Sequence, residues 1–135
     1  MYPIINENAV KEKNVPGRTL RWAVHKEDGL NANHCTMCIM HVEPGETVQP
    51  AHSHEDSEEV LYIIKGEGKV YIDGVIYPFK SGDIVLFEVG KIHMVRNTGK
   101  EVLKVACFFA PYTDLDTYTY FTEIDFDSGE EFVNE

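Results

Sequence analysis

Two histidines and a glutamate lie close together in residues 51–66, which read AHSHEDSEEVLYIIKG. His52 and His54 are two residues apart, and on a β-strand this spacing places both rings on one face because side chains alternate with a period of two. Glu59 follows after an odd number of steps and would face the other way on an unbroken strand. The polar residues 55–58 predict a bend that resets the alternation. The segment therefore predicts part of a divalent metal site with nitrogen and oxygen ligands.

A further candidate ligand, His93, lies in a second segment, residues 82–97, which reads GDIVLFEVGKIHMVRN. Together the two segments resemble the two motifs of the cupin superfamily. The first motif consists of a glycine, a His-x-His pair, a glutamate and a second glycine, at positions matched here by Gly45, His52, His54, Glu59 and Gly66. The second consists of a glycine, a Pro-x-Gly turn, a histidine and an asparagine, and its matching positions here are Gly82, Gly90, His93 and Asn97.

The sequence departs from the cupin pattern in two places. Six residues, where the family has five, separate Gly45 from His52, and Glu88 stands where the family usually has proline. Proline would fix the backbone of this turn, so its replacement affects the shape of a loop and leaves the ligand set intact. Glu88 is then either a solvated surface charge or a carboxylate that tunes the site electrostatically from the mouth of the barrel.

The resemblance implies an all-β chain folded as an antiparallel double-stranded β-helix, which is a jelly-roll barrel. It also implies one divalent transition metal per chain, and the ligands it assigns are His52, His54, Glu59 and His93. Members similar to this chain commonly hold iron or manganese, and the same ligands suit zinc, nickel and cobalt. On an octahedral ion, four protein ligands leave about two positions for a chelating small molecule.

Three classes of function are compatible with this resemblance. The first is a metal-dependent enzyme acting on a small organic molecule, with an oxygenase-type reaction favoured because the pocket walls are expected to be apolar: Leu61, Ile63, Leu86, Val95 and Phe108. The second is an isomerase, lyase or decarboxylase. The third is a non-catalytic module that binds a small molecule or sugar and keeps the metal for stability.

Composition excludes several other classes of protein. The 135 residues fit one domain, and 23 acidic against 12 basic residues give a net charge of −11, which argues against a nucleic-acid partner. No apolar run approaches the roughly 18–20 residues that span a bilayer. The first residues, MYPIINENAVKEK, lack the basic start and apolar stretch of a secretory signal. The expected location is the cytoplasm.

Short strands separated by glycine or proline recur between residues 18 and 111, which is typical of an antiparallel sandwich or barrel. Asp73-Gly74 between two apolar runs predicts a tight hairpin. We expect residues 1–17 to form an N-terminal arm with a short strand near Ile4, and residues 112–135 to form a tail whose acidic end is loosely held. The aromatic run 112–121 is expected to cover the core, close the barrel mouth or contact a second subunit.

His41 is a weak candidate for a catalytic base, because it lies on the strand before the first motif, although an outward position fits the strand pattern better. Alternation with core residues places Arg21 and Arg96 outside the barrel. His25 and His34 flank a polar loop and are expected at the surface.

The three cysteines and the outer face of one strand allow two further predictions. A lone Cys-x-x-Cys pair fits neither a zinc ribbon nor a helix-start redox motif, so Cys35, Cys38 and Cys107 are expected to be small buried apolar residues. Val60, Tyr62 and Ile64 give their strand a second apolar face. Such a face calls for a partner, so we predict a homodimer.

Overall fold

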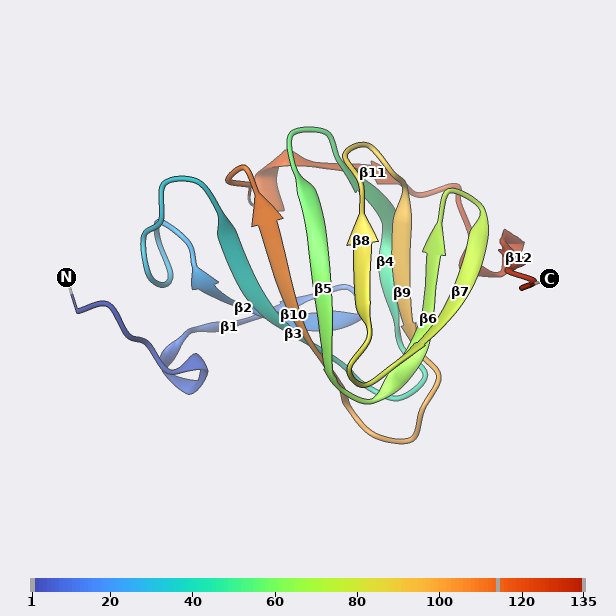
Figure 1. Ribbon diagram of the computed structural model, residues 1–135, viewed down its shortest axis with the longest axis horizontal. Helices are drawn as coiled ribbons and strands as arrows, with labels where there is room; N and C mark the ends of the chain where they lie inside the picture. Colours follow the sequence, from blue (N-terminus) through green and yellow to red (C-terminus); the bar gives the residue numbers. More distant parts are fainter. Residues whose placement is uncertain (1, 114, 135) are drawn as a thin grey trace.

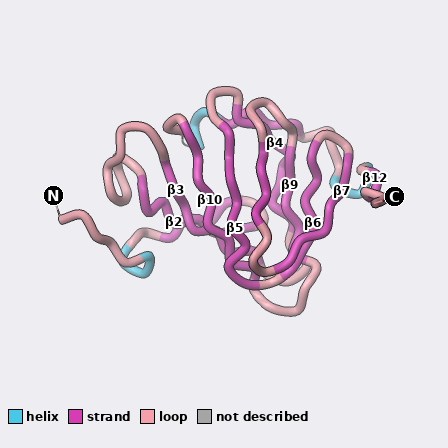
Figure 2. Tube along the Cα trace, viewed as in Figure 1, coloured by secondary structure: helices cyan, strands magenta, loops and turns pink. Residues whose placement is uncertain are grey.

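The computed structural model describes residues 2–113 and 115–134, and these form an all-β chain. Its strands are β1 (Glu12–Val15), β2 (Arg18–Val24), β3 (Thr36–Val42), β4 (Thr47–His54), β5 (Glu58–Lys65), β6 (Glu67–Ile72), β7 (Val75–Lys80), β8 (Ile84–Phe87), β9 (His93–Asn97), β10 (Leu103–Ala110), β11 (Tyr118–Phe121) and β12 (Glu130–Glu131). The helical elements are short 3-10 turns: η1 (Glu7–Ala9), η2 (Leu115–Thr117) and η3 (Phe126–Ser128). They lie in the two terminal segments (Figure 2). Within the described residues, no helix is long and apolar enough to cross a lipid bilayer.

The strands form two sheets that face each other (Figure 1). One has the order β1-β2-β3-β10-β5-β8 and the other β11-β4-β9-β6-β7-β12. Pairing is antiparallel except where β12 lies parallel to β7. This arrangement confirms the expected jelly-roll barrel. The side chains between the sheets form the main core, in which the largest fully buried members are Trp22, Phe87, Phe109, Leu61 and Ile63.

The hairpin between β6 and β7 has the tight turn that its sequence predicts. Ile72 pairs with Val75, so the connection consists of the two residues Asp73 and Gly74. Both have positive φ, 45° and 91°, which is the backbone that suits the right-handed twist of the flanking strands. The Asp-Gly pair therefore fixes the register of this hairpin.

The terminal segments pair with the barrel more extensively than composition suggests. The expected strand near Ile4 is absent, since this side chain is 66% exposed, and the arm instead contributes β1, which pairs with β2. In the tail, β11 adds to the edge of β4, and β12 adds to β7. Figure 1 shows β11 crossing the rim of the barrel above β4.

The acidic end of the tail is held against the second sheet, contrary to the expectation that it is loose. Phe126 is 3% exposed and packs in a second apolar cluster on the outer side of that sheet. Arg96 forms an ion pair with Asp127 at 2.7 Å, and the Lys69 ammonium lies 2.8 Å from Glu131. One buried aromatic ring and these pairs supply the cohesion that a count of acidic residues misses.

The outer face of the first sheet carries an exposed apolar patch. We call it the β5–β8 patch, and its exposed members are Tyr62, Ile64, Ile84, Leu86 and Phe108. Leu86, Phe108 and Ile63 were predicted to line the pocket, and this is wrong. Ile63 is buried in the core but is not among the residues around the cavity. The other two have chain neighbours, Phe87 and Phe109, that are buried in the barrel, so alternation turns Leu86 and Phe108 outward.

Candidate metal centre

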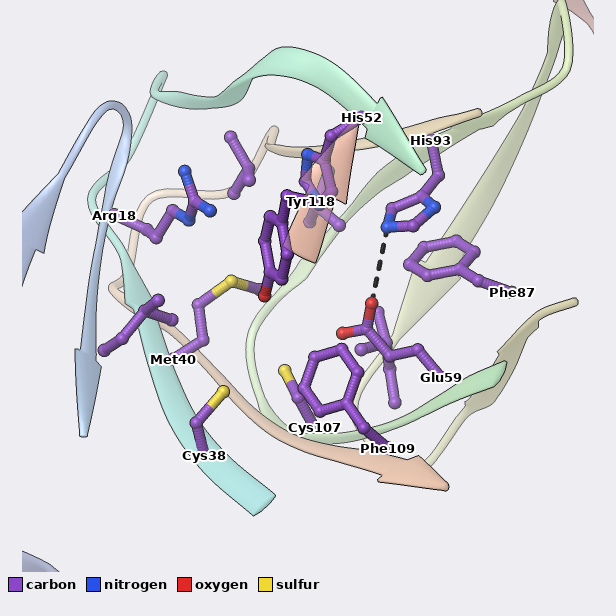
Figure 3. Close-up of a pocket in the computed structure, with 14 residues that line it drawn as sticks. Arg18, Cys38, Met40, His52, Glu59, Phe87, His93, Cys107, Phe109 and Tyr118 are labelled. Atoms are coloured by element: carbon purple, nitrogen blue, oxygen red, sulfur yellow. Dashed lines mark ion pairs between the residues drawn. The ribbon is translucent and has the colours of Figure 1, made fainter. Parts of the chain in front are cut away.

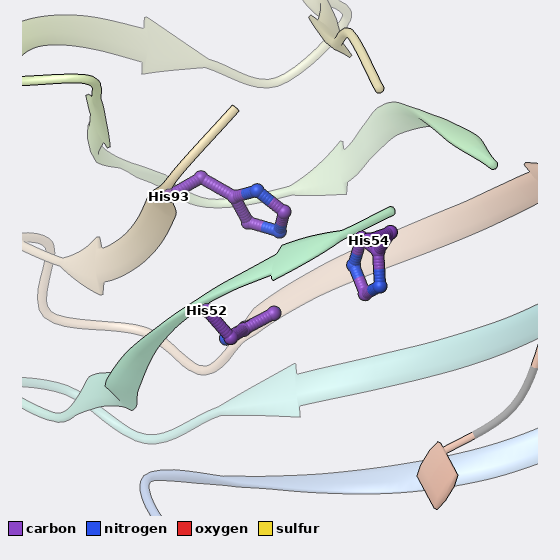
Figure 4. A group of neighbouring side chains, drawn as sticks. All are labelled: His52, His54 and His93. Carbon is purple, nitrogen blue, oxygen red and sulfur yellow. The ribbon is translucent and has the colours of Figure 1, made fainter. Parts of the chain in front are cut away.

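Three histidines converge inside the barrel from two neighbouring strands. His52 and His54 end β4, His93 begins β9, and His52 pairs directly with His93. One ligand atom from each ring lies within 4.8 Å of the others, and the three side chains are 2–4% exposed (Figure 4). Such a buried group of three imidazoles can hold a divalent metal ion.

Glu59 reaches the same place from the opposite sheet. A bend over residues 55–57 separates β4 from β5, and after it Glu59 points into the barrel with 6% of its surface exposed. Its Oε1 lies 3.0 Å from His54 Nε2. The same atom forms an ion pair with His93, whose Nε2 lies 3.3 Å away (Figure 3). The structure thus brings together all four side chains that the sequence singled out, and the bend resets the parity as expected.

Backbone carbonyls fix two of the imidazole rings. The Nδ1 atoms of His52 and His93 lie 3.2 Å and 3.0 Å from the carbonyl oxygens of Pro50 and Lys91. A carbonyl only accepts, so each Nδ1 donates a proton and each Nε2 keeps its lone pair. His93 Nε2 and His54 Nδ1 are buried and have no hydrogen-bond partner among the described residues. A metal ion at this point would satisfy such a lone pair, so these residues fit the metal that the family implies.

The electrostatics favour the ligand forms of these groups. Burial lowers the pKa of His52 well below its usual value, and His93 and His54 lower this pKa further. Burial alone raises the pKa of Glu59, but contacts with His54 and His93 outweigh burial and hold the pKa well below its usual value. At neutral pH the site therefore contains a neutral imidazole and an ionised carboxylate, the forms that bind metal ions.

Aromatic rings enclose the histidines. Tyr118 stacks on His52 at a centroid distance of 4.9 Å and meets His54 edge-on at 4.3 Å, while Phe87 stacks on His93 at 3.8 Å. The free volume beside the rings is about 20 Å³, room for one or two water-sized groups. The residues around it are Arg18, Leu20, Cys38, Met40, Val48, His52, Glu59, Leu61, Phe87, His93, Val95, Cys107, Phe109 and Tyr118. The aromatic run of the tail thus supplies a cover for the site.

Other candidates from the sequence lie elsewhere. His41 is half-buried between the inward-facing Met40 and Val42 on β3, and it is not among the residues around the cavity. Burial, Lys104 and Arg21 lower the pKa of His41, in that order of effect. Glu88 is exposed and also lies outside the set that lines the cavity.

Two predictions of burial need correction, one for His25 and one for Cys35. His34 is exposed as predicted, but His25 is 5% exposed, because its ring packs 5.4 Å from Trp22 and 5.8 Å from Tyr112. Cys38 and Cys107 are buried as predicted, whereas Cys35 is exposed, since it precedes β3. Loop composition does not reveal that Tyr112, 87 positions beyond His25, returns to cover it.

Two polar residues of the cavity were missed in the sequence. Arg18 begins β2 and shares a face with Leu20 and Trp22, so strict alternation already places it inward. Tyr118 is brought to the site only by the pairing of β11 with β4, in which it lies opposite His54. No local pattern signals that long-range pairing.

Residues 38–109 match the family model described as the cupin domain. Among curated relatives, the oxalate-binding protein of Thermotoga maritima is 37% identical over 65 residues, which are 48% of this chain and 53% of that protein. The L-ectoine synthase of Halomonas elongata is 33% identical over 87 residues, 63% of this chain and 58% of that enzyme. The chain spans about half the length of the first curated relatives that it matches.

Solved structures share the fold at low sequence identity. A predicted oxalate decarboxylase from Thermotoga maritima superimposes with a TM-score of 0.71 at 22% identity, over 81% of this chain and 99% of that one. The polyketide cyclase RemF from Streptomyces resistomycificus gives a TM-score of 0.69 at 17% identity, over 87% and 89% of the two chains. At these identities the likeness concerns the barrel.

Proposed function

This chain belongs to the cupin family, and we propose that it binds one divalent transition metal, at which it chelates and transforms a small organic molecule. The observation that carries the proposal is the buried convergence of His52, His54 and His93. Among the described residues, His93 Nε2 and His54 Nδ1 have no hydrogen-bond partner. Glu59 is proposed as the fourth ligand, because its Oε1 lies within 3.3 Å of two of the histidine nitrogens.

Iron or manganese is the proposed metal, and zinc, nickel and cobalt are the alternatives that this donor set accepts. A bound divalent ion supplies Lewis acidity to a chelated ligand. The protein holds the imidazoles by the carbonyls of Pro50 and Lys91 and excludes water with Phe87, Phe109 and Tyr118. These contacts preorganise the site before the ligand arrives.

Metal analysis of the purified chain tests this proposal. We expect close to one metal ion per chain, and we expect His54→Ala and Glu59→Ala to lose most of it. His34→Ala is the matched control, because His34 is exposed and should leave the metal content unchanged. Stoichiometric metal in a variant with alanine at both His52 and His54 would refute the ligand assignment.

An oxygenase-type enzyme is the first reaction class to test, with isomerases, lyases and decarboxylases next. Apolar walls remain around the cavity, including Leu61, Val95 and Phe109, and they suit a reaction that excludes bulk water. Dioxygen uptake by the metal-loaded chain, measured with a panel of small chelating acids, tests this class. Turnover of an acid without dioxygen uptake would favour the other reaction classes.

A non-catalytic binding protein is the second candidate function. It is favoured by the lack of a base at neutral pH among the described cavity residues other than the proposed ligands. Burial raises the pKa of Tyr118 well above its usual value, and the hydrogen bond with Cys38 together with burial raises the pKa of Cys107. Tight binding of a chelating acid that the metal-loaded chain never converts would favour this candidate.

The proposed assembly is a homodimer formed through the β5–β8 patch. Ile84 is 70% exposed and Leu86 is 50% exposed, and both lie on a strand at the edge of the first sheet. Contiguous exposed apolar side chains of this kind favour contact with another protein surface. A second copy of the chain offers the same patch, so the contact can close with twofold symmetry.

A further inference from the structure

Arg18 places a cation inside the barrel. It is 8% exposed and lies on the same face of β2 as Leu20 and Trp22, which are 2% and 1% exposed. The turn that leads into it requires glycine: Gly17 has a φ of 80°, and a Cβ there would lie 1.8 Å from the Thr47 carbonyl oxygen. The backbone is therefore built to start β2 with an inward side chain at this position.

Among the described residues, the guanidinium of Arg18 has no counter-ion. Its Nη1 donates to the carbonyl oxygen of Pro16 at 3.0 Å, its Nε is buried without a partner, and no carboxylate of the described residues forms an ion pair with it. By contrast, Arg21 on the same strand lies 3.4 Å from a carboxylate oxygen of Glu12. Burying an unpaired guanidinium costs free energy, and an anionic partner from outside the chain would offset that cost.

Arg18 belongs to the same cavity as the proposed metal ligands. Figure 3 shows its guanidinium directed toward Tyr118 and His52, with Glu59 and His93 at the other end of the cavity. Arg18, His52 and His93 therefore line one cavity, so a ligand bound there could contact all of them.

The charges in the cavity are unbalanced once a divalent ion is bound. Glu59 is the one acidic side chain around the cavity among the described residues, and Arg18 is the one side chain with a permanent positive charge. The ion and Arg18 together outweigh Glu59 by roughly two positive charges. A neutral ligand would leave that excess buried, whereas an anion would neutralise it.

We propose that Arg18 is a carboxylate-binding residue, and that the ligand chelated at the metal is a small carboxylate such as a dicarboxylate or a 2-oxo or 2-hydroxy acid. This inference rests on the proposed metal function and assigns its ligand class. The planar guanidinium donates paired hydrogen bonds to a carboxylate, which a single ammonium group cannot reproduce. The metal ion would hold two donor atoms of the ligand. Arg18 would favour a ligand whose remaining atoms carry a negative charge.

Tyr118 occupies the space that this ligand needs. The free volume of about 20 Å³ is too small for a carboxylic acid of several atoms, and the Tyr118 ring fills the region toward Arg18. β11, which carries Tyr118, is a four-residue edge strand that pairs with β4 alone. A short edge strand of this kind opens locally at low cost, so the ligand enters by displacing the ring.

Calorimetry with the manganese-loaded chain tests the proposal, with oxalate as the carboxylate probe and acetohydroxamate as a chelator without a carboxylate. We expect Arg18→Gln to weaken oxalate binding by about 10- to 150-fold, the range for a hydrogen bond to a charged group. The same substitution should change the affinity for acetohydroxamate by less than about 3-fold. Arg21→Gln is the matched control on the same strand and should leave both affinities unchanged.

Metal content and melting curves are measured first for all three proteins. A wild-type chain without metal overturns the proposed function and, with it, the assignment of Arg18. Equal metal contents with equal oxalate affinities overturn the assignment of Arg18 alone. If Arg18→Gln does not fold, Arg18→Lys decides the question: it retains the charge but loses the paired geometry, so weaker oxalate binding supports the proposal and native affinity refutes it.

Discussion

Removing the ring of Tyr118 is expected to open the metal centre. In Tyr118→Ala the chain loses the stack on His52 at 4.9 Å and the edge contact with His54 at 4.3 Å. Each such ring contact contributes about 0.5–1.5 kcal/mol beyond burial, so the two together hold the cover closed by about 1–3 kcal/mol. Because every 1.4 kcal/mol corresponds to a factor of ten, the closed cover slows escape from the site by about 5- to 150-fold.

The assay is the release of the bound metal to excess chelator, followed with a coloured indicator. We expect Tyr118→Ala to release metal about 5- to 150-fold faster than the wild type at equal initial metal content. Tyr118→Phe keeps the ring, and no hydrogen bond from the Tyr118 hydroxyl is found among the described residues, so its rate should stay within about 2-fold.

Tyr120→Ala is the matched control for this experiment. Tyr120 lies on the same strand but is 47% exposed, and its ring lies 6.3 Å from His52 in a tilted arrangement. Its removal should change the release rate little. Wild-type release from Tyr118→Ala, or equal acceleration in Tyr120→Ala, would refute the idea that Tyr118 covers the site.

Three further outcomes are expected. The pKa of His52 in the folded chain lies below the ordinary value of 6.5. The unfolded chain therefore binds a proton more readily, and the metal-free chain should lose stability as the pH falls below about 6.5. A melting temperature of the metal-free chain that stays flat between pH 7 and about 5 would contradict this. Asn97→Ala should lower the free energy of unfolding by about 2–4 kcal/mol in a denaturant titration, because Asn97 donates to Val42 and Glu101 and accepts from Gly99, whereas the exposed Asn31→Ala should cost little. Ile84→Lys should shift the chain to monomer in light scattering, and a wild-type chain that is already monomeric at high micromolar concentration would remove the proposed dimer.

The sequence by itself predicted the barrel and the four side chains that meet inside it. A period of two along a strand decides which face a residue occupies, and the His52–His54 pair, the bend before Glu59 and the Asp73-Gly74 turn are all local signals. Asn97 is only partly local, since its buried side chain bonds to the Glu101 carbonyl and the Gly99 N–H a few residues away but also to the distant Val42 carbonyl. The inward position of Arg18 could have been predicted by the rule of alternation, because Arg18 lies on the same strand face as Leu20 and Trp22.

Tertiary structure alone decided what covers the site and what faces solvent. Tyr118 reaches His54 because β11 pairs with β4, a contact between residues 64 positions apart that no short-range period encodes. Phe126 likewise finds its apolar pocket on a sheet surface made by other segments. The composition of the tail predicts only its charge, whereas burial depends on which distant surface each aromatic ring meets, and that is a property of the whole packed barrel.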